Sequence, residues 1–412
     1  MPGTVGVIHH ERSYFPVDLH EAIGDAARLV WILVDGYGQA ASEQRLLRHL
    51  GRVVAIESQD LELAAQTLTE AGIDGIVTFV DDHLVLAADL AAMLGLPHHT
   101  PAVARTVANK YLQRSALAAA GVPGPCFWHL PAGLDHDALE RAIAEVTYPA
   151  VLKPVHGSAS RGIVEVASAD ALRSAHRPNV EHIVEAYLPD TPARDARFAS
   201  YLSVESVVSH AEISHVALTG RFPLEGSCRE TGNFIPAAVP AGLEQQLLEI
   251  ADQAIRALGI TDAALHTEIK LTPAGPRVIE VNGRLGGRPP FVLQRVSDVN
   301  LFRAACEIAL GRPVRYRGLA ECRGVGFWRM IQPPACAREV ANVHGAAEVM
   351  AFPGVDTVRI RRGPGEPVDV ALGTDGAVAT VHGSAETLDA LASVIEAIDE
   401  GLRFDYLVEA AV

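Results

Sequence analysis

The chain has 412 residues, of which 49% are hydrophobic and 20% charged, a composition typical of a globular protein with two or three domains. The formal net charge of −16 argues against a nucleic-acid partner, because no basic stripe offsets it. No basic-then-apolar leader is present, and no apolar run reaches the roughly 18 residues of a membrane span, so we expect a cytoplasmic protein without a membrane partner. The five cysteines form no CxxC pair, which argues against a zinc knuckle or a redox motif.

The first hundred residues alternate short apolar runs with helical patterns. Strands are expected over residues 5–9, 29–34, 53–56 and 75–80, with helices between them. This alternation predicts a parallel, doubly wound sheet. The glycine fingerprint GxGxxG is missing after the first strand, which argues against a dehydrogenase.

A lysine-bearing strand is followed directly by a loop of small residues. The strand is expected over residues 148–155 and carries Lys153 among apolar neighbours. A lysine in a buried strand needs an anionic partner or ligand. The loop 156–162 (HGSASRG) offers backbone N–H groups and the hydroxyls of Ser158 and Ser160 to a phosphate. A plain hairpin with a flexible tip is the alternative.

Further elements lie on both sides of this strand and loop. One helix is predicted over residues 106–120, with Lys110 inside it, and a strand over residues 182–188. Taken alone, a helix lysine is nearly always a solvated surface group. Residues 201–209 and 212–219 then predict a hairpin.

The loop over residues 220–236 brings Glu230 and Asn233 close together in sequence. Polar residues in such a loop could bind a substrate, or they could be ordinary surface groups. A long amphipathic helix is expected over residues 243–258.

The stretch over residues 266–288, HTEIKLTPAGPRVIEVNGRLGGR, predicts a β-hairpin, because two alternating runs flank a break at PAGP. A turn centred on Ala274 sets the register. The cross-strand pairs that it predicts are Glu268–Glu280, His266–Asn282 and Lys270–Val278.

Two carboxylates directly opposite each other repel unless a positive charge lies between them. Mg²⁺ would fit Glu268 and Glu280, with Asn282 as a third oxygen ligand on the same face. Arg284 continues this face with a fixed positive charge. A solvated polar face with a tolerated Glu pair is the alternative. Beyond residue 311 come a mixture of short strands and Gly/Pro turns and a final helix over residues 386–401.

These motifs resemble the ATP-grasp superfamily. HTEIKLT followed by VIEVNGRLGG is similar to its metal and phosphate hairpin, and the lysine strand with its loop is similar to its phosphate-covering loop. The resemblance is closest to the L-amino acid ligases, the bacilysin-synthetase type of carboxylate–amine ligase. It implies an α/β (α+β) ATP-grasp fold. Its expected parts are an N-terminal domain over 1–103, a small lid subdomain over 104–190, a central catalytic subdomain over 191–320 and a C-terminal α+β subdomain over 321–412.

The resemblance also implies roles for individual residues. The metal ligands, for two Mg²⁺ ions with Mn²⁺ as an alternative, are Glu268, Glu280 and Asn282. The residues expected to bind ATP are Lys110, Lys153, Ser158, Ser160, Gly162, Glu185, Ala186, Tyr187, Leu188 and Lys270. Of these, Glu185 would take the exocyclic amine of adenine or lie beside it. The expected substrate contacts are Glu205, Glu230, Asn233, Arg284, Gly286, Gly287 and Arg288, and the expected catalytic residues are Arg284, Lys153 and Glu230.

The implied reaction activates a small-molecule carboxylate, that of an amino acid, as an acyl phosphate and joins it to the amine of a second amino acid. Two alternatives stay open: a carboxylase or purine-pathway type of ligase acting on a small acid, and a non-catalytic ATP-binding module. The resemblance also implies a homodimer. Arg288 leads to a further hypothesis, that the acyl pocket favours an anionic substrate group, with a salt bridge that merely supports the hairpin as the alternative.

Overall fold

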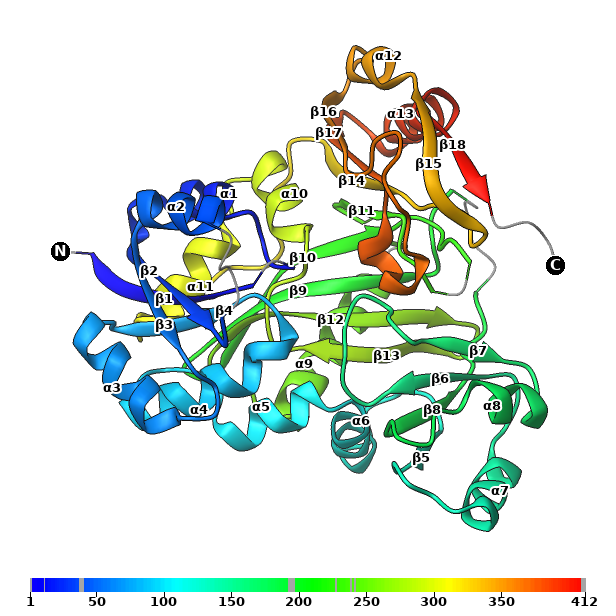
Figure 1. The fold of residues 1–412 in the computed structure, drawn as a ribbon, viewed down its shortest axis with the longest axis horizontal. Coiled ribbons are helices and arrows are strands. Elements are labelled where there is room, and N and C mark those ends of the chain that lie inside the picture. Colours follow the sequence, from blue (N-terminus) through cyan, green and yellow to red (C-terminus); the bar gives the residue numbers. More distant parts are fainter. Residues whose placement is uncertain are drawn as a thin grey trace.

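The computed structural model describes the whole chain except residues 1, 11, 37–40, 192–196, 227, 238, 241 and 409–412. Its mixed α/β architecture contains four sheets, which confirms the predicted fold class (Figure 1). Within these described residues, no helix is long and apolar enough to cross a membrane.

The N-terminal unit is a parallel sheet of order β3-β2-β1-β4, as the strand–helix alternation predicts. Its strands are almost wholly apolar because both faces are covered: Trp31 and Ile32 belong to separate core clusters and are fully buried. The elements are β1 (Gly3–His9), α1 (Pro16–Ile23), β2 (Ala27–Val34), α2 (Ala41–Leu50), β3 (Arg52–Ile56), α3 (Leu61–Ala71), β4 (Gly75–Thr78) and α4 (Leu84–Leu94).

The single helix predicted over residues 106–120 is wrong. Two helices, α5 (Pro101–Ala108) and α6 (Lys110–Ala119), meet at Asn109. Asn109 has extended φ and ψ of −116° and 112°, and its side chain accepts the N–H of Leu112 at 3.0 Å, which caps α6. The break makes Lys110 the first residue of a helix instead of an interior one.

A small antiparallel sheet of order β5-β8-β6-β7 follows, with α7 and α8 packed on one face. Asp135 and Ser168 cap these helices by accepting the N–H groups of Ala138 and Ala171. The elements are β5 (Phe127–Leu130), α7 (His136–Glu145), β6 (Ala150–Pro154), β7 (Val164–Val166), α8 (Ala169–Ala175) and β8 (His182–Ala186).

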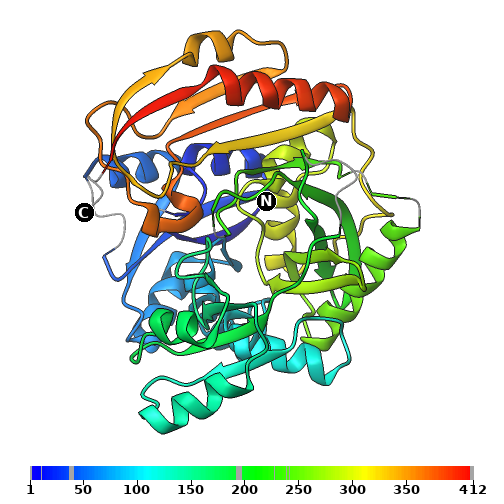
Figure 2. The same ribbon diagram turned by 90° about the vertical axis from the view of Figure 1, so that its right-hand side faces the viewer.

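The central sheet has eight strands in the order β13-β12-β9-β10-β11-β14-β17-β16. It contains both predicted hairpins, β9–β10 and β12–β13, and α9 covers the hairpin end. Figure 2 shows the smaller units gathered around this sheet. The elements before residue 310 are β9 (Tyr201–Ser209), β10 (Glu212–Arg221), β11 (Gly232–Ile235), α9 (Leu243–Ala257), β12 (Ala263–Thr272), β13 (Gly275–Asn282), α10 (Pro289–Val296) and α11 (Leu301–Ala309).

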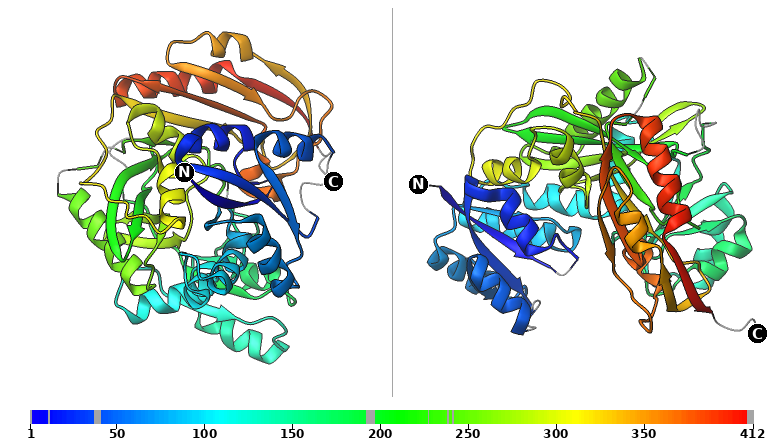
Figure 3. Two further views of the ribbon diagram at one scale, coloured as in Figure 1. Left: turned by 90° about the vertical axis from the view of Figure 1, so that its left-hand side faces the viewer. Right: turned by 90° about the horizontal axis from the view of Figure 1, so that it is seen from above.

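The C-terminal part continues the central sheet, because β14, β17 and β16 extend it beyond β11 (Figure 3). The helices α12 and α13 pack on one face of this extension, and β15 pairs with β18 in a separate ribbon. The elements are β14 (Val325–Ile331), β15 (Ala337–His344), α12 (Ala346–Met350), β16 (Val355–Ile360), the 3₁₀ turn η3 (Val370–Gly376), β17 (Ala379–Ala385), α13 (Leu388–Gly401) and β18 (Arg403–Val408).

Candidate active site

The β12–β13 hairpin brings the predicted carboxylates together. Glu268 lies opposite Glu280, and His266 lies opposite Asn282, as predicted. The Nδ2 group of Asn282 donates to Glu280 at 3.1 Å. The side chains of the two glutamates are 19% and 23% exposed, so they are open to a ligand from one side.

The predicted pairing of Lys270 with Val278 is wrong. The register shifts by one residue beyond the carboxylate pair, since Ile279 is an extra residue in β13. Ile269 therefore pairs with Val278, and Lys270 with Arg277. Val278 is fully buried in the core as a result, and the Glu pair itself lies on the unshifted side of the bulge.

Lys110 reaches the hairpin from the start of α6. Its Nζ lies 3.1 Å from Oε2 of Glu280 and donates to the carbonyl of Gly157 at 3.0 Å. Burial raises the pKa of Glu280, but the charges of Lys110 and Lys153 outweigh this effect and hold the pKa at about 2. Burial lowers the pKa of Lys110, and Glu280 raises it to above its ordinary value. Lys110 is therefore charged and lies between the hairpin and the 156–162 loop.

The phosphate loop (residues 156–162) connects β6 to β7 and carries the predicted contacts Ser158, Ser160 and Gly162. Ala159 and Ser160, at its tip, both have left-handed φ, of 58° and 57°. The carbonyl of Ala159 accepts the N–H of Thr374, in η3, at 2.9 Å. The C-terminal part of the chain thus holds this loop, a contact that no sequence pattern indicates.

Glu268, Glu280 and Asn282 offer hard oxygen ligands on one face of the hairpin. Two carboxylates opposite each other across an antiparallel pair need a positive charge nearby. Mg²⁺ prefers such oxygens and leaves coordination positions for phosphate oxygens. The donor set and its partial exposure therefore fit the divalent cation that the sequence predicts.

Lys153 is held from behind by Glu185. Its Nζ is 2.6 Å from one oxygen of Glu185, and Nε of Arg114 is 2.8 Å from the other. Arg114 also donates to the carbonyls of Val278, at 2.8 Å, and Ile279. Burial raises the pKa of Glu185, but Arg114 and Lys153 outweigh burial and hold the pKa at about 2. Both oxygens of Glu185 are therefore engaged within the protein, and its place at adenine stays a prediction.

The main chain after β8 has one free donor at the expected adenine edge. The N–H of Ala186 donates to the carbonyl of Cys126 at 2.9 Å, and that of Tyr187 to Pro149 at 3.0 Å. Among the residues that the structure describes, none accepts the N–H of Leu188. The contact of this donor with a base stays a prediction.

Glu230 shares a single buried guanidinium with other carboxylates. Nε of Arg221 lies 3.6 Å from Glu230, its NH2 group lies 3.8 Å from Glu268, and only 3% of Arg221 is exposed. Burial raises the pKa of Glu230, Arg221 lowers it and Glu268 raises it again, so that the pKa is above its ordinary value.

Glu205 and Asn233 add oxygens that have no donor. Glu205 is fully buried, and one of its oxygens accepts from Ser203 at 2.7 Å and Thr219 at 2.8 Å. Its other oxygen and Oδ1 of Asn233 are buried without a hydrogen-bond partner. Arg221 supplies positive charge on this side of the site, but none of its donors bonds to these two oxygens, and a metal ion or a substrate ammonium group would supply the missing partner.

Residues 107–288 match the model of a family described as "ATP-grasp domain". This chain contains an ATP-grasp domain. Carnosine synthase 1 of Homo sapiens is 28% identical to it over an alignment of 296 residues that covers 65% of this chain and 35% of that protein. Alanine–anticapsin ligase of Bacillus subtilis (strain 168) is 23% identical over an alignment of 251 residues that covers 56% of this chain and 52% of that one. The chain thus spans about a third of the carnosine synthase and about half of the bacterial ligase.

A crystal structure of an L-amino acid ligase from Bacillus licheniformis superposes with a TM-score of 0.79 at 19% identity, and covers 99% of both chains. This likeness extends the ATP-grasp fold over the flanks as well as over the matched domain. The predicted resemblance to the ATP-grasp superfamily, and within it to the L-amino acid ligases, is confirmed.

The N-terminal unit also reaches this ATP-grasp site. Arg284 pairs with Asp81, at the end of β4, and donates to the carbonyl of Leu285 at 3.0 Å. Burial lowers the pKa of Arg284, but Asp81 raises it to above its ordinary value. The hydroxyl of Tyr14 donates to the carbonyl of Gly286. The segment expected to pass the acyl substrate is therefore fixed by the N-terminal unit.

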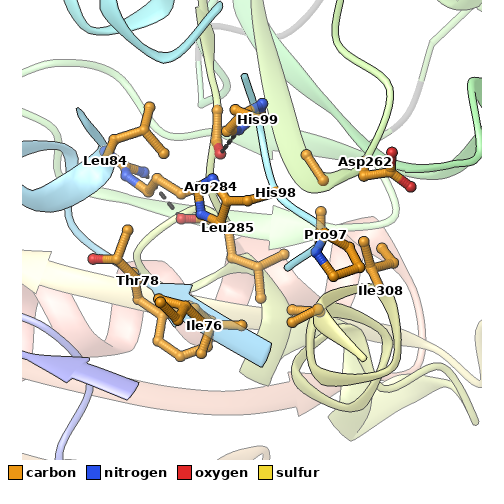
Figure 4. Close-up of a pocket in the computed structure, with 17 residues that line it drawn as sticks. Ile76, Thr78, Leu84, Pro97, His98, His99, Asp262, Arg284, Leu285 and Ile308 are labelled. Atoms are coloured by element: carbon orange, nitrogen blue, oxygen red, sulfur yellow. Dashed lines mark hydrogen bonds between the residues drawn. The ribbon is translucent and has the colours of Figure 1, made fainter. Parts of the chain in front are cut away.

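A small cavity of about 50 Å³ lies behind Arg284, between β4, α11 and the start of β12 (Figure 4). His99 closes one wall by a 2.8 Å hydrogen bond to the carbonyl of Gly283. The volume has room for water but not for an amino acid. This cavity is therefore too small to be a substrate site.

Two residues with predicted ligand contacts, Lys270 and Arg288, have partners within the protein. Lys270 pairs with Asp190, so its predicted role at the nucleotide stays a prediction. The guanidinium of Arg288 stacks 4.6 Å from the ring centroid of Trp328. No described carboxylate lies within ion-pair distance of it, which disagrees with the alternative of a supporting salt bridge.

The sequence prediction missed Arg114 and Arg221. Arg114 lies one helical turn after Lys110, so it shares the face of α6 that carries a predicted phosphate ligand. That spacing could have indicated it. Arg221 ends a strand whose other inward residues are apolar or hydroxylic, and no local pattern distinguishes it from a surface arginine.

Proposed function

We propose that this ATP-grasp ligase activates the carboxylate of an amino acid as an acyl phosphate and joins it to the amine of a second amino acid. The observation that carries the proposal is the Glu268–Glu280 pair, open to ligand on one side and flanked by Lys110. Alanine–anticapsin ligase, by its name, joins the amino acid alanine to another compound, which supports the substrate class.

The site would hold ATP as one substrate. Lys110 and Lys153 would neutralise its phosphates, with the phosphate loop covering them and Leu188 binding the base. Glu268, Glu280 and Asn282 would hold Mg²⁺, which supplies charge neutralisation at phosphate oxygens when bound. We propose that two Mg²⁺ ions bind here and that Mn²⁺ can replace them.

The proposed chemistry has two displacements. A carboxylate oxygen of the first substrate attacks the γ-phosphorus and ADP leaves, which gives the acyl phosphate. The amine nitrogen of the second substrate then attacks the acyl carbon, phosphate leaves, and the amine loses a proton to give the amide. Arg284, charged and partly buried, would stabilise the negative charge that develops on the acyl oxygen. Glu230 would bind a substrate ammonium group and Asn233 a carboxylate or carbonyl.

The test is ADP release with Mg·ATP and pools of amino acids and small acids, with hydroxylamine present to trap an acyl phosphate as a hydroxamate. We expect a hydroxamate from at least one amino-acid pool and an amide product when amines replace hydroxylamine. ADP release that depends on bicarbonate or another small acid, without an amino-acid hydroxamate, would overturn the proposal in favour of a carboxylase or purine-type ligase.

A matched pair of variants links this activity to the hairpin. Glu280→Gln removes one charge from the carboxylate pair, and we expect it to lower kcat/KM roughly 100-fold or more, since a bound cation contributes several kcal/mol to such a transition state. Glu244→Gln makes the same change on an exposed face of α9 and should leave kcat/KM within a factor of two. Equal activity in the two variants would contradict the assigned metal site.

A further inference from the structure

Three arginines lie near Arg284 and close enough to act on one another or on a shared neighbour, Asp375. Arg288 is the residue before α10, Arg359 lies in β16 and Arg361 directly follows that strand. Arg359 and Arg361 are two residues apart at the end of β16. We name these three residues the arginine cluster.

The cluster has no carboxylate partner of its own. In the described part of the chain, no carboxylate lies within ion-pair distance of Arg288, Arg359 or Arg361. The contacts that hold two of them are aromatic: Arg288 lies over Trp328, and Arg359 lies 5.8 Å from the ring centroid of Phe15. Their hydrogen-bond donors are therefore left for another acceptor.

The arginines act on one another electrostatically. Burial lowers the pKa of Arg288, and the charges of Arg361 and Arg359 lower it further. Tyr14 and Asp18 act in the opposite direction and raise it. Partial desolvation likewise lowers the pKa of Arg361, Asp375 raises it, and Arg362 and Arg359 lower it. Like charges are thus concentrated without full compensation, in a chain whose net charge is −16.

The cluster borders the ligase site and does not lie on a remote surface. Asp375 directly follows Thr374. Burial raises its pKa, and the charges of Arg361, Arg161, Arg288 and Arg284 lower it. Thr374 donates its N–H to the phosphate loop and accepts the N–H of Glu230 at 3.2 Å. Phe15, the residue before α1, lies beside Arg359 of β16. The arginines therefore lie where the N-terminal unit, the hairpin and the C-terminal sheet meet.

We propose that the arginine cluster is a subsite for an anionic group of one substrate, a carboxylate or a phosphate that is remote from the reacting atom. Guanidinium groups bind both anions through paired N–H donors. This inference rests on the proposed function, and it narrows the substrate class to amino acids with an acidic or phosphorylated side chain. Arg359 and Arg361 become specificity residues that no ATP-grasp motif in the sequence includes.

The test uses the full chain and two compound pairs of matched shape, L-glutamate with L-glutamine and O-phospho-L-serine with L-serine. Each compound is offered first as the acid and then as the amine in the ADP-release assay, and kcat/KM is measured. Calorimetric titration of the same four compounds into enzyme with Mg·ADP gives binding without turnover. The variants are Arg359→Gln/Arg361→Gln and, as the control, Arg362→Gln, one residue further along the chain.

We expect the wild type to prefer at least one anionic compound over its neutral partner by about tenfold or more, as hydrogen bonds to charged groups imply. The double variant should lose about tenfold of that ratio, and Arg362→Gln should keep it. Preference for glutamate alone identifies a carboxylate group, and preference for phosphoserine alone identifies a phosphate. A ratio of one in the wild type, equal loss in both variants, or a change confined to the KM for ATP would overturn the subsite.

The two proposals fail in different ways. Release of ADP with neutral and anionic compounds alike would overturn the subsite and leave the ligase proposal standing. Calorimetric binding of an anion that depends on Arg359 and Arg361, with no ADP released from any pool, would overturn the ligase proposal and leave the subsite standing.

Discussion

Two buried charge clusters on opposite sides of the Glu268–Glu280 pair differ in how well their charges are matched. In the first, both oxygens of Glu185 are engaged, one by Arg114 and one by Lys153. In the second, Arg221 lies 3.6 Å from Glu230 and 3.8 Å from Glu268, His266 lies 3.6 Å from Glu268, and neighbouring oxygens of Glu205 and Asn233 have no hydrogen-bond partner. The pKa of Glu185 is held at about 2, whereas that of Glu230 is raised.

The difference indicates that the first cluster supports the site and the second binds a ligand. Because both oxygens of Glu185 already have partners, Glu185 fixes the position of Lys153 and has no acceptor left for a ligand. An undersaturated cluster is electrostatically incomplete until a cation or a donor arrives. The second cluster is therefore the place where we expect a metal ion or an ammonium group to bind, and the two clusters should respond in opposite directions to loss of a carboxylate.

The largest effect should come from Glu185→Ala. It leaves Arg114 and Lys153 buried beside each other without a counter-charge, and removal of one partner from a buried ion pair costs about 3–5 kcal/mol. We expect a clear fall in Tm by scanning calorimetry and a lower denaturant midpoint. Glu181→Ala, which breaks the surface pair with His129, should cost at most about 1 kcal/mol. Similar losses in the two variants would show that the first cluster is not a tight unit.

Glu230→Gln should act in the reverse direction on stability. A raised pKa means that the folded protein disfavours the charged carboxylate, so a neutral side chain of the same shape removes a cost. We expect Tm to stay constant or rise, while kcat/KM for the amino substrate falls, by roughly 10- to 100-fold, through the loss of a charged contact to ammonium. A lower Tm together with unchanged kcat/KM would make Glu230 a structural residue.

The pH dependence of stability sharpens this contrast. The folded-state pKa of Glu230 lies above its unfolded value, so the native wild type takes up a proton first as the pH falls from 7, and it gains stability relative to Glu230→Gln. For Glu185 the folded pKa lies below the ordinary value of 4.5, so its contribution is complete above pH 4.5 and is lost only toward pH 2. Between pH 7 and 5 we expect the stability difference between the wild type and Glu230→Gln to narrow. The difference between the wild type and Glu185→Ala should stay constant. Thermal denaturation measures both.

Local patterns predicted the parts of this molecule in which neighbours along the chain decide the structure. The strand–helix alternation predicted the parallel sheet, and period-two alternation around a short turn predicted that Glu268 faces Glu280. The joining of β14, β17 and β16 to the central sheet depends on pairing with distant strands, which no local pattern encodes. No local pattern indicates the bulge at Ile279 either, because it needs neither glycine nor proline.

The charge clusters show the same limit. Lys153 stood out because a lysine among apolar strand residues must find a partner. Its partner Glu185 and the role of Arg114 follow only from the packing of α6 against β8 and β13, and Arg221 reads in sequence as a surface residue. Chemical type therefore identified individual charges, whereas the matching of charges had to come from the fold.

The smallest effect should come from the helix caps. It should distinguish a cap that only stabilises its helix from one that also positions a site residue. Asn109→Ala and Thr100→Ala each remove a side-chain cap, from α6 and α5 respectively, and each should cost about 1 kcal/mol of stability. Only Asn109 precedes Lys110, so only its loss should loosen the contact of Lys110 with Glu280. We expect similar Tm values for the two variants, with the KM for ATP raised about fivefold in Asn109→Ala alone, a factor that corresponds to about 1 kcal/mol. If KM rose equally in both variants, the position of Lys110 would depend on the general stability of the helix pair, and the break at Asn109 would have no separate part in aiming it.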